Sequence, residues 1–115
     1  MGTELRDTVA AIVRGTGTLQ VPYLCDAEVA AVLRALLRAG EVDEDLAHEA
    51  IRDYGTIARH QQLGLLPRVL ELRANLSAYD ALYVALAEKL GARLLTTDAR
   101  LARAARNHTD VPVLP

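Results

Sequence analysis

Three carboxylates, Glu28, Asp80 and Asp98, stand at the edges of apolar segments of the sequence. Asp80 opens the helix expected over residues 77–90, Asp98 ends the short apolar run "ARLLTTD", and Glu28 follows "TLQVPYL" within about one helical turn. Like charges grouped at one place repel one another, and a cation relieves that repulsion. Oxygen ligands without cysteine or histidine beside them favour a hard ion such as Mg²⁺ or Mn²⁺. Such an ion can activate water for attack on a phosphodiester.

Each of these acids also has a purely structural explanation. Ser77-x-x-Asp80 matches the capping-box pattern at a helix start. Asp98 and Asp26 both follow a strand and precede a helix, which is the usual place of an N-cap. Glu28 is expected in the first turn of its helix, where the helix dipole favours an anion. For any one of these acids, the role of cap or dipole partner is favoured over a catalytic role by about two to one.

The elements that must position these acids alternate along the chain. Apolar residues at helical spacing, with glycines as stop signals and Asp43 as a cap, predict helices separated by short apolar strands. This alternation predicts an α/β fold in three α/β/α layers with a short parallel sheet. The expected helices cover residues 3–14, 26–39, 44–55, 66–76, 77–90 and 99–106, and the expected strands cover 18–24, 56–61, 92–98 and 111–115.

The parallel arrangement brings the acids toward one place. In an alternating parallel sheet the covering helices begin at the carboxyl edge of the strands, which is where open α/β sheets bind their ligands. Glu28, Asp80 and Asp98 are therefore expected to point toward one rim.

Length and composition limit the possible classes of protein. The chain has 115 residues, 51% of them hydrophobic, and a net charge of −2, which predicts one globular domain over residues 1–115. The charge excludes a strongly basic nucleic-acid binder but leaves room for a local basic groove. Cys25 is the only cysteine, which favours the reducing cytoplasm. No signal peptide and no apolar run long enough for a membrane span are recognised.

The sequence resembles PIN-domain ribonucleases, in particular the VapC-like toxins of bacterial toxin–antitoxin pairs. The resemblance covers almost the whole chain. It is carried by "VPYLCDAEVAAVLRALLRAGEVDEDLAHEAI", "LLPRVLELRANLSAYDALYVALAEKLGARLLTTDARLARA" and the closing "VPVLP". The second segment is the most specific, because Tyr79-Asp80 is followed by an apolar helix and then by Leu94-Leu95-Thr96-Thr97-Asp98.

This resemblance implies a Mg²⁺- or Mn²⁺-dependent endoribonuclease with Glu28, Asp80 and Asp98 as its catalytic metal ligands. It also implies a homodimer and a small antitoxin protein that covers the site. In this family the chain opens with a central strand that ends in a metal-binding Asp, whereas residues 1–6 here resemble the helix after that strand. The first strand and one ligand are therefore expected to be missing. The alternative is a catalytically impaired module that binds an antitoxin or itself.

Three further residues are candidates for contact with RNA. Thr96 and Thr97 could hold a metal-bound water or orient a phosphate, although strand propensity followed by capping explains them equally. Arg100 begins a helical stripe with Arg103 and Arg106. The stripe could follow an RNA backbone, or it could be an ordinary solvated face.

Overall fold

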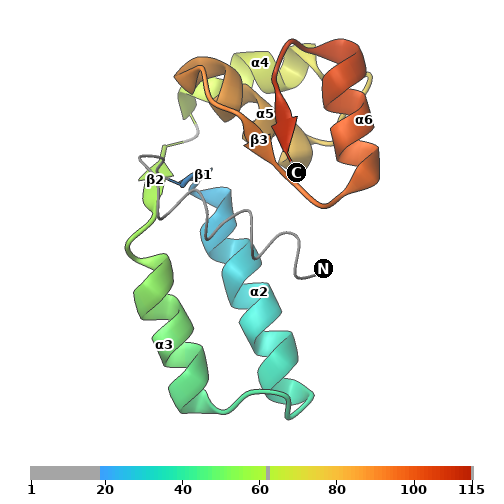
Figure 1. Cartoon of the computed structure of the whole chain (residues 1–115). Helices are drawn as coiled ribbons and strands as arrows, with labels where there is room; N and C mark the ends of the chain where they lie inside the picture. The colour runs from blue at the N-terminus through green and yellow to red at the C-terminus, as the bar shows by residue number, and fades with distance from the viewer. Residues whose placement is uncertain (1–18, 62, 115) are drawn as a thin grey trace. The chain divides into compact units, whose positions relative to one another are not determined.

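A computed structural model describes residues 19–61 and 63–114, in which helices alternate with short strands (Figure 1). The described residues divide into two compact units, residues 19–61 and residues 63–114. The expected helix over residues 3–14 and the expected lack of a first strand fall outside the described residues. The prediction of one domain over residues 1–115 depends on how the two units fit together, and it stays a prediction.

Residues 19–61 form a helical hairpin that begins and ends in a short strand. Figure 1 shows its two helices side by side, joined at one end by a short loop. The two strands pair in parallel, with Gln20 opposite Ala58 and Pro22 opposite His60, which confirms both strands expected here. The elements are β1 (Gln20–Pro22), α2 (Leu24–Arg38), α3 (Glu44–Tyr54) and β2 (Ala58–His60).

The loop of this hairpin has local signals that the sequence predicts. Gly40, just after α2, has a φ of +72°, a backbone conformation that glycine adopts without the clash of a Cβ atom. The side chain of Asp43 then caps α3 by accepting a hydrogen bond of 2.8 Å from the N–H of Leu46. Both signals explain why one helix stops and the next begins within a few residues.

Residues 63–114 form the second unit, which contains a strand–helix–strand crossover. Its strands pair in parallel, with Leu94 opposite Val113, so both strands expected here are confirmed, although each is shorter than predicted. The elements are η1 (Leu63–Leu65), α4 (Leu66–Glu71), α5 (Ala78–Leu90), β3 (Leu94–Leu95), α6 (Ala99–His108) and β4 (Val113–Leu114).

The helix expected over residues 66–76 ends earlier than predicted, at Glu71. The next residues form turns, and Leu72 and Leu76 are both buried there. The chain has to leave the helix before Ser77, because this residue has an extended backbone and caps the next helix.

The core of the second unit is built around α5. The buried residues of this helix lie on nearly all sides, as its apolar sequence predicts, and Val84 has no exposed surface. They pack with leucines, alanines and valines of the neighbouring elements, and Arg68 of α4 bridges to Glu88 of α5 at 2.8 Å. The buried residues of α5 are Ala81, Leu82, Val84, Ala85, Leu86 and Ala87.

The first unit has far less buried surface. Within residues 19–61, only Pro22 and Ala47 are buried, and α2 has no buried residue. Each unit nevertheless has the predicted α/β character with parallel strands. None of the helices described here is long and apolar enough to cross a membrane.

Candidate active site

Asp80 lies in the first turn of α5. The residue before the helix, Ser77, has an extended backbone, and its hydroxyl accepts a hydrogen bond of 3.1 Å from the N–H of Asp80. Ser77 is therefore the predicted cap. Since this bond uses only the backbone of Asp80, its half-buried carboxylate is left for other contacts.

Asp98 caps α6, as its position between a strand and a helix predicts. Its Oδ1 atom accepts hydrogen bonds from the N–H groups of Arg100 at 2.9 Å and Leu101 at 3.3 Å. The hydroxyl of Thr96 accepts a bond of 3.0 Å from the N–H of Asp98 and so fixes the turn. Among the described residues, Oδ2 of Asp98 takes no part in the cap. A capping aspartate can therefore still offer one oxygen to a cation.

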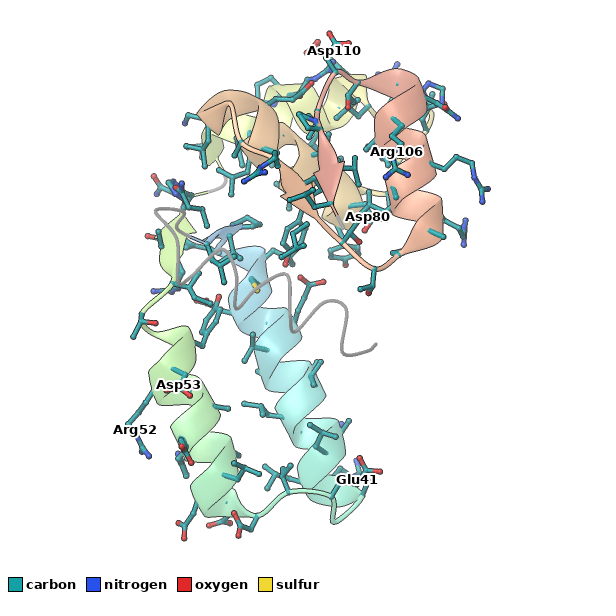
Figure 2. All side chains as sticks on the ribbon, viewed as in Figure 1. Glu41, Arg52, Asp53, Asp80, Arg106 and Asp110 are labelled. Atoms are coloured by element: carbon teal, nitrogen blue, oxygen red, sulfur yellow. The ribbon has the colours of Figure 1, made fainter. Side chains whose placement is uncertain are left out.

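One cavity of about 450 Å³ brings Asp80 and Asp98 together, although they are far apart in the sequence. Figure 2 shows the Asp80 side chain next to α6, the helix that Asp98 caps. All residues that line the cavity belong to residues 63–114: Asn75, Leu76, Ser77, Asp80, Asp98, Arg100, Leu101, Arg103, Ala104, Asn107 and His108.

Glu28 belongs to the other unit, so its meeting with the two aspartates stays a prediction. The expected place of Glu28 in the first turn of its helix is wrong, because α2 begins at Leu24 and its first-turn acid is Asp26. Glu28 is exposed and lies two residues beyond Asp26, in the second turn of the helix. Within residues 19–61 and 63–114, no group of three or more His, Cys, Asp or Glu side chains could hold a metal ion.

Asp26 has a different role from the expected cap. Helix α2 starts two residues earlier than predicted, so its cap position is Tyr23. Tyr23 makes no side-chain cap bond. Asp26 instead accepts hydrogen bonds from both Nε and Nη2 of Arg59 and from the hydroxyl of Tyr54. Arg59 also lies over the ring of Tyr23, 4.9 Å from its centre. These contacts tie the start of α2 to β2 and to the end of α3.

The contacts of Asp26 shift two pKa values in opposite directions. The hydrogen bonds from Arg59, and then that from Tyr54, hold the pKa of Asp26 below its ordinary value. Burial, and then the hydrogen bond to Asp26, raises the pKa of Tyr54 above its ordinary value. Asp26 is thus an ionised acceptor and Tyr54 a neutral donor at neutral pH.

The predicted RNA contacts fall in different places. Arg100 lines the cavity, Thr96 holds the turn before Asp98, and Thr97 is exposed and is not part of the lining. The predicted arginine stripe is divided, because Arg103 lines the cavity and Arg106 does not. A role of these residues in RNA binding stays a prediction.

The sequence did not single out three other lining residues, namely Asn75, Asn107 and His108. Helical periodicity could have found two of them, since Asn107 and His108 follow Arg100 and Leu101 by seven residues, a spacing that shares a face of a helix. Asn75 carries no such signal, because only the turn after α4 brings it to the cavity.

Comparisons with known proteins agree with this fold. The sequence profile of the PIN domain matches residues 2–107. The chain is 40% identical over 99 residues to VapC ribonuclease Mb0985 of Mycobacterium bovis, an alignment that covers 84% of this chain and 78% of that one. It is 42% identical over 87 residues to ribonuclease VapC1 of Mycobacterium tuberculosis, covering 72% of this chain and 65% of that protein.

A solved structure has the same fold. The crystal structure of PAE2754 from Pyrobaculum aerophilum superposes with a TM-score of 0.66 at 23% identity, covering 96% of this chain and 78% of that one. The profile spans more than half of the chain, and the Mycobacterium bovis relative is matched over most of its length. The chain therefore belongs to the PIN-domain family, and its relatives within that family are VapC ribonucleases.

Proposed function

We propose that this chain is an endoribonuclease that hydrolyses RNA phosphodiester bonds in the cytoplasm, with Glu28, Asp80 and Asp98 as its catalytic residues. The observation that carries the proposal is the shared cavity of Asp80 and Asp98, which come from different elements. The names of its relatives, which are ribonucleases, favour RNA as the substrate.

The donors at this cavity fit a divalent metal ion. Asp80 and Asp98 supply carboxylate oxygens, which are the ligands that Mg²⁺ and Mn²⁺ prefer. Asp98 has Oδ2 available while Oδ1 holds the start of α6. Asp80, Asp98 and Glu28 would hold the ion, which supplies an activated water and neutralises phosphate charge.

The remaining residues of the cavity would position the RNA. Arg100 carries a fixed positive charge and its backbone is tied to Asp98, so it would place a phosphate oxygen beside the carboxylates. The hydroxyl of Thr96 accepts a bond from the N–H of Asp98, so it would keep that carboxylate in place while the scissile phosphate approaches.

The proposal is tested by replacing each aspartate with asparagine and measuring cleavage of single-stranded RNA with Mn²⁺. Asp98→Asn removes the charge but keeps a good N-cap, so the fold is retained. Both Asp80→Asn and Asp98→Asn are expected to lower the rate by more than the 10- to 100-fold that loss of an outer partner of a metal ligand typically costs. Asp110→Asn, an exposed acid of the same unit (Figure 2), is the matched control and should cleave normally.

Calorimetric titration with Mn²⁺ gives an independent reading of the same variants. The wild-type chain and Asp110→Asn should bind the ion equally, and Asp98→Asn should bind it more weakly. Wild-type cleavage and wild-type Mn²⁺ affinity in Asp98→Asn would refute the metal role of this residue.

A second candidate function is a binding module that pairs with itself or with a small antitoxin without cleaving RNA. It is favoured by a cavity of about 700 Å³ between α2 and α3, with an apolar lining that includes Val29, Leu33 and Ile51. Exposed apolar side chains between two helices can pack against a protein partner. We also propose a homodimer and an antitoxin partner for the active enzyme.

Light scattering across a range of protein concentrations, combined with the cleavage assay, separates the two candidates. A wild-type chain that dimerises but neither binds Mn²⁺ nor cleaves RNA would favour the binding module. Cleavage that disappears in Asp98→Asn while dimerisation persists would favour the enzyme.

A further inference from the structure

We infer that the part of the cavity that runs along α6 beyond Asp98 is a nucleotide-recognition subsite, in which Arg103 binds a backbone phosphate and Asn107 binds the adjoining base or ribose. The inference rests on the proposed RNA-cleaving function, because it assigns these groups to the nucleotides beside the bond that is cut. It uses only residues of one unit, which all line the same cavity.

The geometry of α6 gives the subsite its length. Nine residues separate Asp98 from Asn107, which is about 13.5 Å of helix at about 1.5 Å per residue. A stacked strand rises about 3.4 Å per nucleotide, so this length matches roughly four nucleotides. The cavity is therefore too long for a single scissile phosphate, and it has room for its neighbours.

The charges in the cavity change along its length. Asp98 caps the start of α6, and Figure 2 shows the Asp80 side chain near that end of the helix. The lining residues further along α6 bring no further acid. Within residues 63–114, Arg103 has no ion-pair partner, whereas Arg68 of the same unit is paired with Glu88. An exposed guanidinium without a partner on the wall of an RNA-cleaving cavity is well suited to bind a phosphate.

The far end of the cavity suits neutral groups better than phosphates. Asn107 and His108 lie in the last turn of α6, where the helix dipole is negative and disfavours an anion. An asparagine amide both donates and accepts hydrogen bonds, as do the edges of bases and the ribose 2′-OH. Asn75 lines the same cavity with a second amide. The phosphate therefore belongs near Arg103 and the base or ribose near Asn107.

The same helix supplies a matched control. Arg106 has the same charge and is exposed, but it is turned about 100° away from Asn107 around the helix axis and does not line the cavity. Figure 2 labels Arg106 on α6 and Asp80 on α5. Arg103, Arg106 and Asn107 are all exposed, so their substitution should leave the fold intact.

The test measures binding of fluorescein-labelled single-stranded RNA oligomers by anisotropy in EDTA, where no metal is bound and no strand is cut. Affinity is measured over a series of NaCl concentrations for the wild-type chain, Arg103→Gln and Arg106→Gln. Arg103→Gln should weaken binding of all sequences about equally and reduce the slope of log K against log salt by about 0.7, the value for one phosphate contact. Arg106→Gln should reduce this slope clearly less.

The second arm uses RNA oligomers of randomised sequence, and the bound fraction is sequenced. Asn107→Ala should reduce the preference for one base by roughly tenfold at a single position, or the preference for RNA over DNA if the amide binds the 2′-OH. Equal salt slopes for Arg103→Gln and Arg106→Gln would overturn the phosphate assignment. Unchanged base and sugar preferences in Asn107→Ala would overturn the assignment of Asn107 to a base or ribose.

The test also separates this inference from the proposed function. RNA binding in EDTA does not depend on metal or on cleavage, so a chain that fails to cleave can still show the Arg103 and Asn107 effects. A chain that cleaves normally but shows neither effect would retain the proposed function and lose the subsite.

Discussion

The two long helices α2 and α5 are both rich in apolar residues, but they have opposite surroundings. Six residues of α5 are buried, whereas no residue of α2 is buried in the structure described. The neighbours explain this difference, because α5 is packed against α4 and β3 and lies in a unit whose other elements add buried leucines. An apolar helix thus contributes to a core only where other elements cover it.

The largest expected effect comes from the same substitution in both units. Leu86 of α5 is 4% exposed and Leu46 of α3 is 50% exposed. Leu86→Ala should lower the free energy of unfolding by about 2–5 kcal/mol, because it removes buried methyl groups and leaves a cavity. Leu46→Ala should lower it by less than about 1 kcal/mol. Urea unfolding followed by circular dichroism measures both values.

Equal losses of stability in Leu46→Ala and Leu86→Ala would contradict this difference between the two units. The side chain of Leu46 would then be buried in solution by a surface that the described residues do not supply. A cost that grows with protein concentration would identify that surface as a second copy of the chain.

Most of the fold was predictable because local signals set it. The caps at Asp43, Ser77 and Asp98, and the glycine after each of α2 and α5, act within a few residues, so the sequence shows them directly. The end of α4 was predicted too late, since the helical spacing of apolar residues continues through Leu72 and Leu76, which lie in the turns after Glu71. The strands were predicted in the right places but too long, because pairing across the sheet decides their length.

The candidate site was predictable to the extent that it follows from caps and strand ends. Asp80 and Asp98 were expected together, and one cavity contains both. The pairing of Asp26 with Arg59 was missed, because the parallel register of β1 and β2 brings together residues that no local pattern connects. Asn75 was missed because only the turn after α4 brings it to the cavity.

Backbone strain at two glycines should have a smaller effect on stability. Gly40 after α2 and Gly91 after α5 both have a positive φ, and an added Cβ would meet no atom within 4 Å at either position. Each Gly→Ala substitution should therefore cost about 1 kcal/mol of backbone strain alone. Thermal unfolding should show equal shifts if the two units unfold in one transition. Two separate transitions, each sensitive to only one of the glycines, would show that the units unfold independently.

Ion pairs give a smaller difference. In the second unit Glu88 accepts two hydrogen bonds from Arg68, at 2.8 and 3.0 Å, and both side chains are partly buried. Glu88→Gln should lower stability by about 0.5–1 kcal/mol, less at high salt. Glu71→Gln is the control, since Glu71 is more exposed and lies 3.9 Å from the same arginine. Equal losses in both variants would contradict a specific role of the bridge between α4 and α5.

The smallest effect concerns the more exposed pair of the first unit and depends on pH. Because Arg59 holds the pKa of Asp26 below its ordinary value in the folded chain, the stability that this carboxylate contributes is fully present above the ordinary aspartate pKa of about 3.9. It is lost as the pH falls through the lowered folded pKa. Asp26→Asn lacks this contribution at every pH. On acidification, the stability of the wild-type chain should therefore fall toward that of Asp26→Asn.

Urea unfolding at a series of pH values, from neutral to below the ordinary aspartate pKa, measures the difference between the two chains. All other carboxylates titrate in both, so their contributions cancel in the difference. Asp53→Asn, an exposed acid of the same unit (Figure 2), should instead stay close to the wild-type chain throughout. A difference between the wild-type chain and Asp26→Asn that does not change with pH would mean that solvent screens the pair completely. The first unit would then be held by its helix caps and strand pairing, without help from its charges.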